Sequence, residues 1–212
     1  MSKKKSRIGI TLRVENIQEY DEKRDAISQE WVNFMEKMDM IPIFIPNTLA
    51  NTKEFLEEME LEGIILSGGD NKGDDPNRDR TEQSLIKYGI SKKIPIVGIC
   101  RGMQVLNNFF GGTHTQTKEN EHVGTNHEIL ITDDEIIKSV KSNTREVNSF
   151  HHNIILEETL GEDLKVFAKS SSDNTIEGFV HNEFPITGIM WHPERESKSE
   201  LEIKFMQIFY GK

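Results

Sequence analysis

The sequence predicts an α/β fold: a mostly parallel central sheet, flanked by helices, with a small antiparallel extension. Two observations predict it. Over residues 8–110, short apolar runs alternate with longer amphipathic segments, the pattern of parallel strands joined by helices. After Gly111-Gly112 the pattern changes to short strands separated by turns, which is typical of antiparallel pairing.

In the first half, apolar residues of Glu19–Asp39 recur at helical spacing, so an amphipathic helix is expected there. The other expected elements of this half are strands at Ile8–Leu12, Ile41–Ile45, Gly63–Leu66 and Ile94–Ile99 and helices at Lys53–Glu60, Arg78–Lys92 and Gly102–Phe110. Ligands of such sheets bind at the carboxyl ends of the strands, so the turns after Leu66 and Ile99 are expected to border a site.

The second half is expected to add antiparallel strands and a closing helix. The expected strands are His127–Thr132, Glu146–Phe150, Leu164–Ser170, Thr175–Val180 and Ile186–Met190, with a helical turn at Ile136–Val140 and the helix at Ser199–Tyr210. No linker, repeat or low-complexity segment separates the halves. We therefore expect one domain, residues 7–212, after a flexible tail, residues 1–6.

Composition narrows the class of protein and its partners. The chain has 212 residues, 35% hydrophobic and 29% charged, with a net charge of -10 and a mean hydropathy of -0.57. A nucleic-acid partner is not expected, because phosphate binding needs a basic face. No apolar run approaches the about 20 residues of a membrane span, so no membrane partner is expected.

A cytoplasmic location is expected on two grounds. The segment Met1–Lys5 has the charge of a signal peptide, but no apolar core of the required length follows it. The single cysteine allows no internal disulfide. The sequence leaves the oligomeric state open, and a homo-oligomer is compatible with it.

The stretch Gly98-Ile99-Cys100-Arg101-Gly102 is a candidate nucleophile elbow. It joins a buried strand to a helix, and the flanking glycines let chain and substrate approach closely. The helix N-terminus beneath the sulfur favours the thiolate, and the backbone N–H of Arg101 is placed to donate to an oxyanion. A buried structural cysteine would also fit this position, so the catalytic interpretation needs a base elsewhere in the chain.

Trp191-His192-Pro193-Glu194 supplies a candidate base. Residues two apart in extended backbone point the same way, and Pro193 biases His192 toward that state. His192 and Glu194 are therefore expected on one face. A histidine that takes a proton from a thiol, oriented by a carboxylate, is the base half of a catalytic triad.

With these motifs in place, the sequence resembles the class I glutamine amidotransferase-like hydrolases over Ile8–Tyr210. The resemblance rests on Cys-x-Gly-x-Gln from Cys100 and His-Pro-Glu from His192, in the right order. It is narrowed to the gamma-glutamyl hydrolase branch by five blocks: Leu66–Asp70, Ile99–Gln104, Gly111–Thr113, Val147–His152 and Ile176–Gly178. The fold implied is the flavodoxin-like glutamine amidotransferase fold.

The resemblance implies a thioester mechanism without a cofactor. Cys100 would attack a side-chain amide carbon, His192 would carry the proton and Glu194 would orient His192. The backbone N–H groups of Gly69 and Arg101 would form the oxyanion hole. The positions implied for glutamyl binding are Gln104, Ser149, Phe150, His151, Asp70, Asn71 and His127.

No metal is expected. The pair His151-His152 invites a metal interpretation, but neighbouring strand residues face opposite ways and cannot chelate one ion together. No His-Glu-x-x-His motif is present either.

The leaving group is left open by the sequence. The loop Asp70–Arg80 borders the expected site and offers Lys72, Arg78 and Arg80, which are candidates to meet an anionic leaving group. The resemblance includes a capsule-pathway member that releases glutamate from a gamma-glutamyl cytidine diphosphoramidate. The alternatives are hydrolysis of gamma-glutamyl-gamma-aminobutyrate in polyamine breakdown, a glutaminase subunit that feeds ammonia to a separate synthetase, and a catalytically silent binding protein.

Overall fold

The computed structural model describes residues 5–117, 122–196 and 200–210. Residues 1–4 of the expected tail and residue 199 of the expected closing helix lie outside this range, and the first strand already begins at Ser6. In the part of the chain that the structure describes, no helix is long and apolar enough to cross a membrane.

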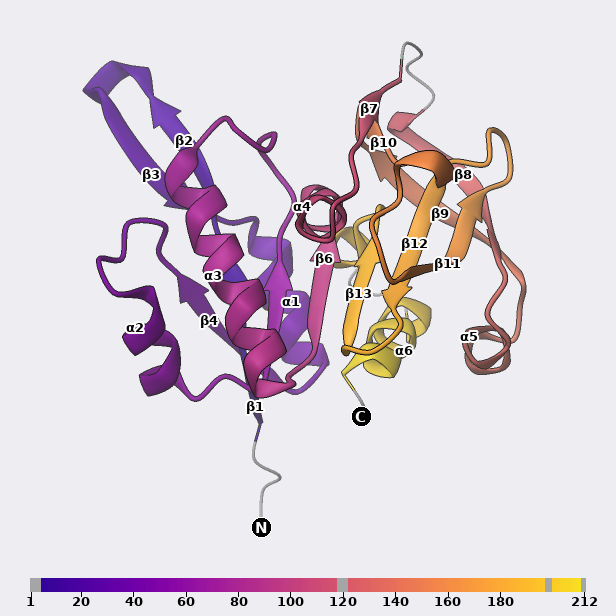
Figure 1. Cartoon of the computed structure of the whole chain (residues 1–212), viewed down its shortest axis with the longest axis horizontal. Helices are drawn as coiled ribbons and strands as arrows, with labels where there is room; N and C mark the ends of the chain where they lie inside the picture. The colour runs from indigo at the N-terminus through magenta and orange to yellow at the C-terminus, as the bar shows by residue number, and fades with distance from the viewer. Residues whose placement is uncertain (1–4, 118–121, 197–199, 211–212) are drawn as a thin grey trace.

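One sheet of nine strands runs through the protein (Figure 1). Its strands, in spatial order, are β4 (Met40–Ile45), β1 (Ser6–Thr11), β5 (Gly63–Leu66), β6 (Ile96–Ile99), β13 (Ile186–Ile189), β12 (Ile176–His181), β11 (Leu164–Ser170), β8 (Val123–Ile131) and β9 (Thr144–Phe150). Neighbours from β4 to β13 pair in parallel, and those from β13 to β9 pair antiparallel. The predicted fold class is confirmed, and its antiparallel part continues the same sheet.

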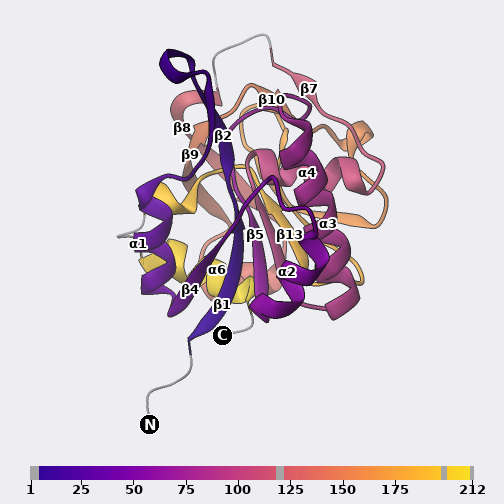
Figure 2. The same cartoon turned by 90° about the vertical axis from the view of Figure 1, so that its left-hand side faces the viewer.

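Helices cover both faces of the sheet, as Figure 2 shows edge-on. Helices α1 (Gln29–Lys37) and α6 (Glu200–Phe209) lie on one face, and α5 (Asp134–Val140) packs beside α6. Helices α2 (Thr52–Met59), α3 (Pro76–Lys92) and α4 (Arg101–Phe109) lie on the other. Each face has its own buried apolar cluster, so the sheet separates two cores.

The prediction of a helix over Glu19–Asp39 is wrong for the residues before Ser28. Residues Arg13–Ile17 (β2) and Glu22–Ala26 (β3) form an antiparallel hairpin with a short 3-10 turn, Gln18–Tyr20 (η1), between them. The amphipathic helix begins only after Ser28, whose hydroxyl accepts a hydrogen bond from the Glu30 N–H. Residues 19–26 contain a single large apolar side chain, Tyr20, and it is exposed, so no apolar stripe holds a helix there against the core.

Four further elements were not expected. Strands β7 (Thr115–Gln116) and β10 (Asn153–Ile154) pair beside the carboxyl ends of the parallel strands. A 3-10 helix, Pro193–Glu196 (η4), follows β13, and another, Glu157–Thr159 (η3), follows β10. In Figure 1 the β2–β3 hairpin projects from the same end of the sheet as β7 and β10.

Candidate active site

Cys100 sits at a strained turn between β6 and α4. Its backbone has φ 52° and ψ -105°, a conformation that residues with a side chain rarely adopt. The two glycines around it allow a very close approach: a Cβ on Gly98 would lie 2.5 Å from the Gly102 carbonyl oxygen, and one on Gly102 would lie 2.1 Å from that of Leu66. Only glycine fits at either place, so the elbow motif has the steric basis that the sequence suggested.

His192 and Glu194 lie beside this elbow. His192 Nδ1 is 2.7 Å from Glu194 Oε1, and the Cys100 side chain is the other hydrogen-bonding partner of the imidazole. A Cβ on Gly68 would lie 2.8 Å from His192 Cε1, so Gly68 leaves room for the ring. The structure thus brings Cys100, His192 and Glu194 together.

The route from His192 to Glu194 differs from the expected one. Pro193 begins the 3-10 helix η4, so Glu194 reaches the imidazole through a tight turn and not along an extended strand. Residues two apart in extended backbone share a face, but here the turn brings the carboxylate back to the ring.

The surroundings of His192 favour its charged form. Burial lowers its pKa and is the largest single effect. Hydrogen bonds with Cys100 and Glu194 and the negative charge of both groups outweigh burial and together raise the pKa of His192 to about 10. At neutral pH the imidazole therefore carries a proton, and an imidazolium beside a cysteine favours the nucleophilic thiolate.

Asn148 on β9 holds the backbone of His192 and was missed by sequence reasoning. Its Oδ1 accepts from the His192 N–H at 2.9 Å, and its Nδ2 donates to the His192 carbonyl oxygen at 2.9 Å. Both partners are buried. Asn148 lies within the block Val147–His152, but nothing in the sequence links it to a residue 44 positions later.

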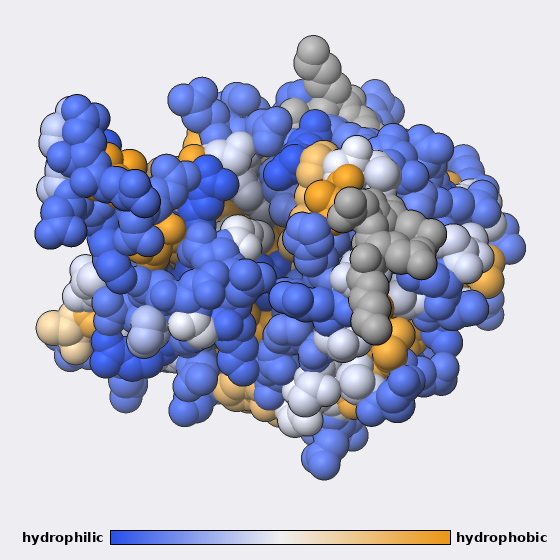
Figure 3. Space-filling view, turned by 90° about the horizontal axis from the view of Figure 1, so that it is seen from above, coloured by the Kyte–Doolittle hydropathy of each residue, from blue (hydrophilic) through white to orange (hydrophobic). Residues whose placement is uncertain are grey.

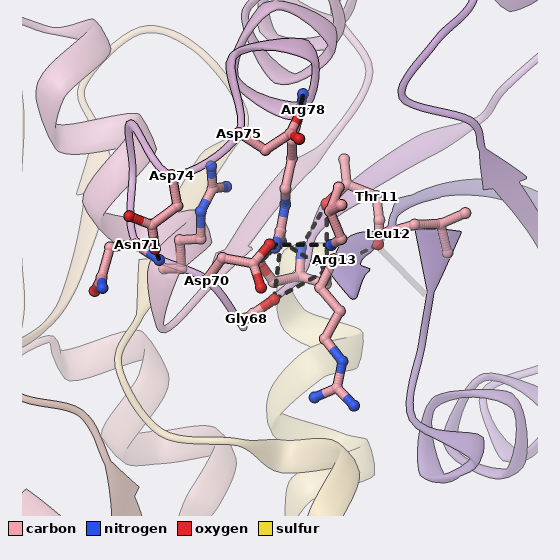
Figure 4. Close-up of polar contacts among 12 residues, drawn as sticks. Thr11, Leu12, Arg13, Gly68, Asp70, Asn71, Asp74, Asp75 and Arg78 are labelled. Atoms are coloured by element: carbon pink, nitrogen blue, oxygen red, sulfur yellow. Dashed lines mark hydrogen bonds and ion pairs between the residues drawn. The ribbon is translucent and has the colours of Figure 1, made fainter. Parts of the chain in front are cut away.

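The turn that carries Gly69 is built by Arg78. Arg78 Nη2 donates to the carbonyl oxygens of Ser67, at 2.9 Å, and Gly68, at 2.8 Å, and Nη1 lies 3.1 Å from Asp70 Oδ2. Figure 4 shows Arg78 reaching from α3 to Asp70 and Gly68. Gly69 itself has φ +116°, and a Cβ there would lie 2.9 Å from the Arg13 Cβ, so glycine is required at this position.

This placement corrects the expectation for Arg78 as a leaving-group contact. The side chain is completely buried, and its nitrogens are taken by the turn, by Asp70 and by Glu82. The other two cations of the loop do not line the pocket at Cys100. Lys72 borders a separate small hollow with Asp79, and Arg80 donates to Asn77.

The Arg101 guanidinium is also buried, and it shares an ion-pair partner with Arg78. It pairs with Asp79 at 2.7 Å and with Glu82, and the other oxygen of Glu82 is 3.1 Å from Arg78 Nε. Glu82 therefore links the two segments that carry the predicted oxyanion donors, the Gly68-Gly69 turn and the start of α4. Sequence reasoning missed Glu82, which reads as one polar residue of an amphipathic helix.

The residues expected to bind a glutamyl group fall into two groups. Gln104 and Asn71 meet through Asn153, whose Nδ2 lies 3.2 Å from the side-chain oxygen of each. Phe150 packs edge-on to the His192 ring at a centroid distance of 6.0 Å. Of these three, Phe150 lines the pocket at Cys100.

The remaining four of those residues are engaged elsewhere. Asp70 Oδ2 accepts from the Val14 N–H at 3.0 Å and so holds the hairpin to the Gly69 turn. The Ser149 hydroxyl, which is fully buried, donates to the His122 carbonyl oxygen at 2.8 Å. His127 and His151 both face Glu177. The expected role of these four side chains in glutamyl binding stays a prediction.

A pocket of about 170 Å³ opens beside Cys100. Its wall includes the three candidate catalytic residues, the Gly68-Gly69 turn and one of the expected substrate contacts: Cys100, His192, Glu194, Gly68, Gly69 and Phe150. The rest of the wall comes from the hairpin, from α1 and from η4, and includes Arg13 and Arg195, which sequence reasoning missed. The Arg195 guanidinium carbon lies 3.8 Å from the centre of the Phe150 ring. Figure 3 looks onto this end of the molecule, where hydrophilic residues predominate.

The chain matches the model of a known protein family. The model of the peptidase C26 family matches residues 7–194, which include the whole elbow, the His192–Glu194 pair and most of the sheet.

Curated proteins and solved structures are also similar to the chain. Gamma-glutamyl-CDP-amidate hydrolase of Campylobacter jejuni is 38% identical over 197 residues, 90% of this chain and 90% of the relative. The carbamoyl phosphate synthase small chain of Aquifex aeolicus is 33% identical over 145 residues, 68% of this chain and 36% of the relative. The crystal structure of a glutamine amidotransferase from Thermotoga maritima, 15% identical, superposes with a TM-score of 0.71 and covers 98% of this chain and 99% of that chain.

Proposed function

The chain belongs to the peptidase C26 family of glutamine amidotransferase-like proteins, and we propose that it is a cysteine-dependent hydrolase that cleaves a gamma-glutamyl amide bond and releases glutamate. One observation carries the proposal. Cys100, on a strained turn at the mouth of a pocket, lies next to a His192 that is held by Glu194 at 2.7 Å. Family membership supports amide hydrolysis, and this arrangement supports the cysteine mechanism.

In the proposed reaction, Cys100 Sγ attacks the carbonyl carbon of the side-chain amide. The proton of the thiol resides on His192, whose pKa of about 10 keeps it protonated at neutral pH. His192 gives that proton to the leaving nitrogen as the C–N bond breaks and a glutamyl thioester remains. Water, deprotonated by His192, then attacks the thioester, glutamate leaves, and the Cys100 thiolate beside protonated His192 is regenerated.

The negative oxygen of each tetrahedral intermediate would be bound by the backbone N–H groups of Gly69 and Arg101. The ion-pair network through Arg78, Glu82 and Arg101 supports this role, because it makes the two donor segments one rigid unit. Asn148 would act as a positioning residue that keeps His192 at the distance required for proton transfer.

We propose a gamma-glutamyl nucleotide amidate, such as gamma-glutamyl-CDP-amidate, as the substrate. Similarity to a hydrolase of that name over 90% of both chains favours it. The position of Arg13 and Arg195 in the pocket wall favours an anionic leaving group, since guanidinium groups bind diphosphate through paired hydrogen bonds. These two arginines replace Lys72, Arg78 and Arg80 in our proposal for leaving-group recognition. A place in capsule biosynthesis, implied by the resemblance, is part of the same proposal.

The test is a glutamate-release assay with gamma-glutamyl-CDP-amidate, gamma-glutamyl-gamma-aminobutyrate and glutamine. The nucleotide substrate is expected to have the highest kcat/KM, and Cys100→Ala is expected to lose all measurable turnover while it retains the wild-type circular dichroism spectrum. Preference for the aminobutyrate compound would transfer the proposal to polyamine breakdown. Turnover of glutamine alone would indicate a glutaminase, and full activity of Cys100→Ala would refute the mechanism.

A further inference from the structure

A second cluster of titratable side chains lies apart from the Cys100 pocket. His122, just before β8, His151, just after β9, and Glu177 on β12 are all buried. His151 Nε2 is 3.6 Å and His122 Nδ1 is 4.0 Å from the same oxygen, Glu177 Oε1, and all three ligand atoms lie within 4.8 Å of one another. A third histidine, His127, places Nε2 3.5 Å from the other oxygen of Glu177.

Outer partners determine which ring nitrogens of the first two histidines carry hydrogen. His122 Nε2 is 2.8 Å from the carboxylate of Asp173, and His151 Nδ1 is 3.0 Å from the Asn153 carbonyl oxygen. Both partners are acceptors, so each of these nitrogens is the N–H donor. In the neutral rings the inner nitrogens, His122 Nδ1 and His151 Nε2, then present lone pairs toward Glu177.

The inner atoms lack hydrogen-bond partners among the described residues. Both oxygens of Glu177, His122 Nδ1, His151 Nε2 and both ring nitrogens of His127 are buried without a hydrogen bond. Glu177 Oε2 has His127 as a partner at 3.5 Å, but the buried Oε1 faces two ring nitrogens that present lone pairs, which is a costly arrangement. A cation between them would remove that cost.

We propose that His122, His151 and Glu177 bind a divalent transition-metal ion of the zinc class. Two imidazoles and one carboxylate are ligands that Zn²⁺ accepts. Tetrahedral ligands at about 2.0–2.2 Å from an ion are about 3.3–3.6 Å apart. His151 Nε2 and His122 Nδ1 lie 3.6 and 4.0 Å from Glu177 Oε1, and the three ligand atoms lie within 4.8 Å of one another, so binding requires a contraction of the cluster.

The outer hydrogen bonds match those of metal-bound histidines. Such histidines usually donate their second N–H to a carboxylate or a backbone carbonyl, which orients the ring. Asp173 does this for His122, and the Asn153 carbonyl does it for His151. The sequence argument against a metal considered His151 with His152, and His152 is indeed exposed while His151 is buried. The partners of His151 come from distant segments.

The ion would act structurally and would not take part in catalysis. It would tie β12 to the segments before β8 and after β9. Through the His151–Asn153 hydrogen bond it would also hold Asn153, which bridges Gln104 and Asn71. The proposal does not depend on the proposed hydrolase activity, because its test measures metal content and stability.

The experiment uses the full chain with Cys100→Ser, which removes the thiol as an alternative ligand. After dialysis against Zn²⁺ and desalting, this protein is expected to retain about one equivalent of zinc by mass spectrometry. Its Tm should rise with Zn²⁺ and not with Mg²⁺, since the ion binds the native state. Co²⁺ should give the visible absorption of a four-coordinate site.

Three variants in that background locate the ion. Glu177→Gln, which preserves the shape, should lose the zinc and the Tm response. Asp173→Asn should weaken zinc binding by about 10- to 100-fold. The matched control, His152→Ala, should bind as tightly as its parent. Absence of zinc and of a Tm response in the Cys100→Ser protein, or zinc that persists in Glu177→Gln, would overturn the proposal.

Discussion

Arg78 carries its charge into the interior of the protein, with no part of its side chain exposed. Its guanidinium holds the Ser67 and Gly68 carbonyl oxygens and two carboxylates, so no donor is left for a diphosphate. Arg13 and Arg195, which are distant in sequence, line the pocket instead. The type of residue indicates what it can bind, but its neighbours determine whether it is available.

At the same scale, Asn148 provides a test of how His192 is positioned. Asn148→Ala removes the hydrogen bonds to the His192 N–H and carbonyl oxygen, so the imidazole is held less well for proton transfer. We expect kcat to fall by about 10- to 100-fold, with little change in KM, because small displacements of a catalytic group are costly. Steady-state kinetics with the preferred substrate measure this.

The control for that variant is Asn126→Ala. Asn126 lies directly opposite Asn148 on the neighbouring strand, but it is exposed and contacts Glu146. Wild-type kinetics are expected. An Asn148→Ala enzyme whose KM rises while kcat stays constant would contradict a positioning role.

The pKa of His192 predicts an alkaline limit for acylation. The folded-state pKa is raised to about 10, above the ordinary value of about 6.5. The proton needed by the leaving nitrogen is therefore present at neutral pH and is lost as the pH rises through about 10. We expect kcat/KM to fall tenfold per pH unit above that value. Glu194→Gln removes one cause of the raised pKa of His192, so the alkaline decrease in kcat/KM should begin at lower pH. An unchanged alkaline decrease would contradict its assignment to His192.

At the scale of elements, the β2–β3 hairpin is the main departure from expectation. The helical spacing of apolar residues from Ile27 onward is real, but it cannot be extended back through residues 19–26, which are predominantly polar. Ser28 is a helix-capping residue in the sequence and marks the correct start of α1. The hairpin matters for function because it brings Arg13 to the pocket.

Arg13 therefore tests the role of the hairpin. Arg13→Ala should raise KM for gamma-glutamyl-CDP-amidate by about tenfold or more, since a charge-assisted hydrogen bond contributes about 1.5–3 kcal/mol, and should leave kinetics with gamma-glutamyl-gamma-aminobutyrate unchanged. The matched control is Arg24→Ala in the same hairpin: Arg24 pairs with Glu22 as Arg13 pairs with Glu15, but Arg24 does not line the pocket. Equal losses on both substrates would contradict a role in leaving-group recognition.

At the scale of the whole molecule, one sheet unites the two halves of the chain. Strand β13, from the second half, pairs in parallel with β6, which ends at the candidate nucleophile. His192 follows β13 closely, so this pairing brings the two reacting side chains to the same edge of the sheet. Strands β12, β11, β8 and β9 then continue the sheet, and β9 contributes Asn148.

The buried ion-pair network joins α3, α4 and the turn after β5, so its loss should affect global stability. Glu82→Gln leaves two buried guanidinium groups without their shared carboxylate. Removing one partner of a buried pair costs about 3–5 kcal/mol. Urea unfolding should show a correspondingly lower midpoint. The control is Arg80→Ala, which changes an exposed residue on the same helix and should alter the midpoint little. A Glu82→Gln protein as stable as wild type would contradict the role assigned to the network.

The sequence by itself determined the fold class, most of the strands and helices, the elbow at Cys100 and the pairing of His192 with Glu194. These features depend on local patterns: apolar spacing, glycines at a strand end, and two residues close in the chain. Tertiary structure alone decided what surrounds them. Asn148, Glu82, Arg13 and the Glu177 cluster act through contacts between segments far apart in sequence, and burial, which turned Arg78 from a candidate ligand contact into a structural residue, follows from how whole elements pack.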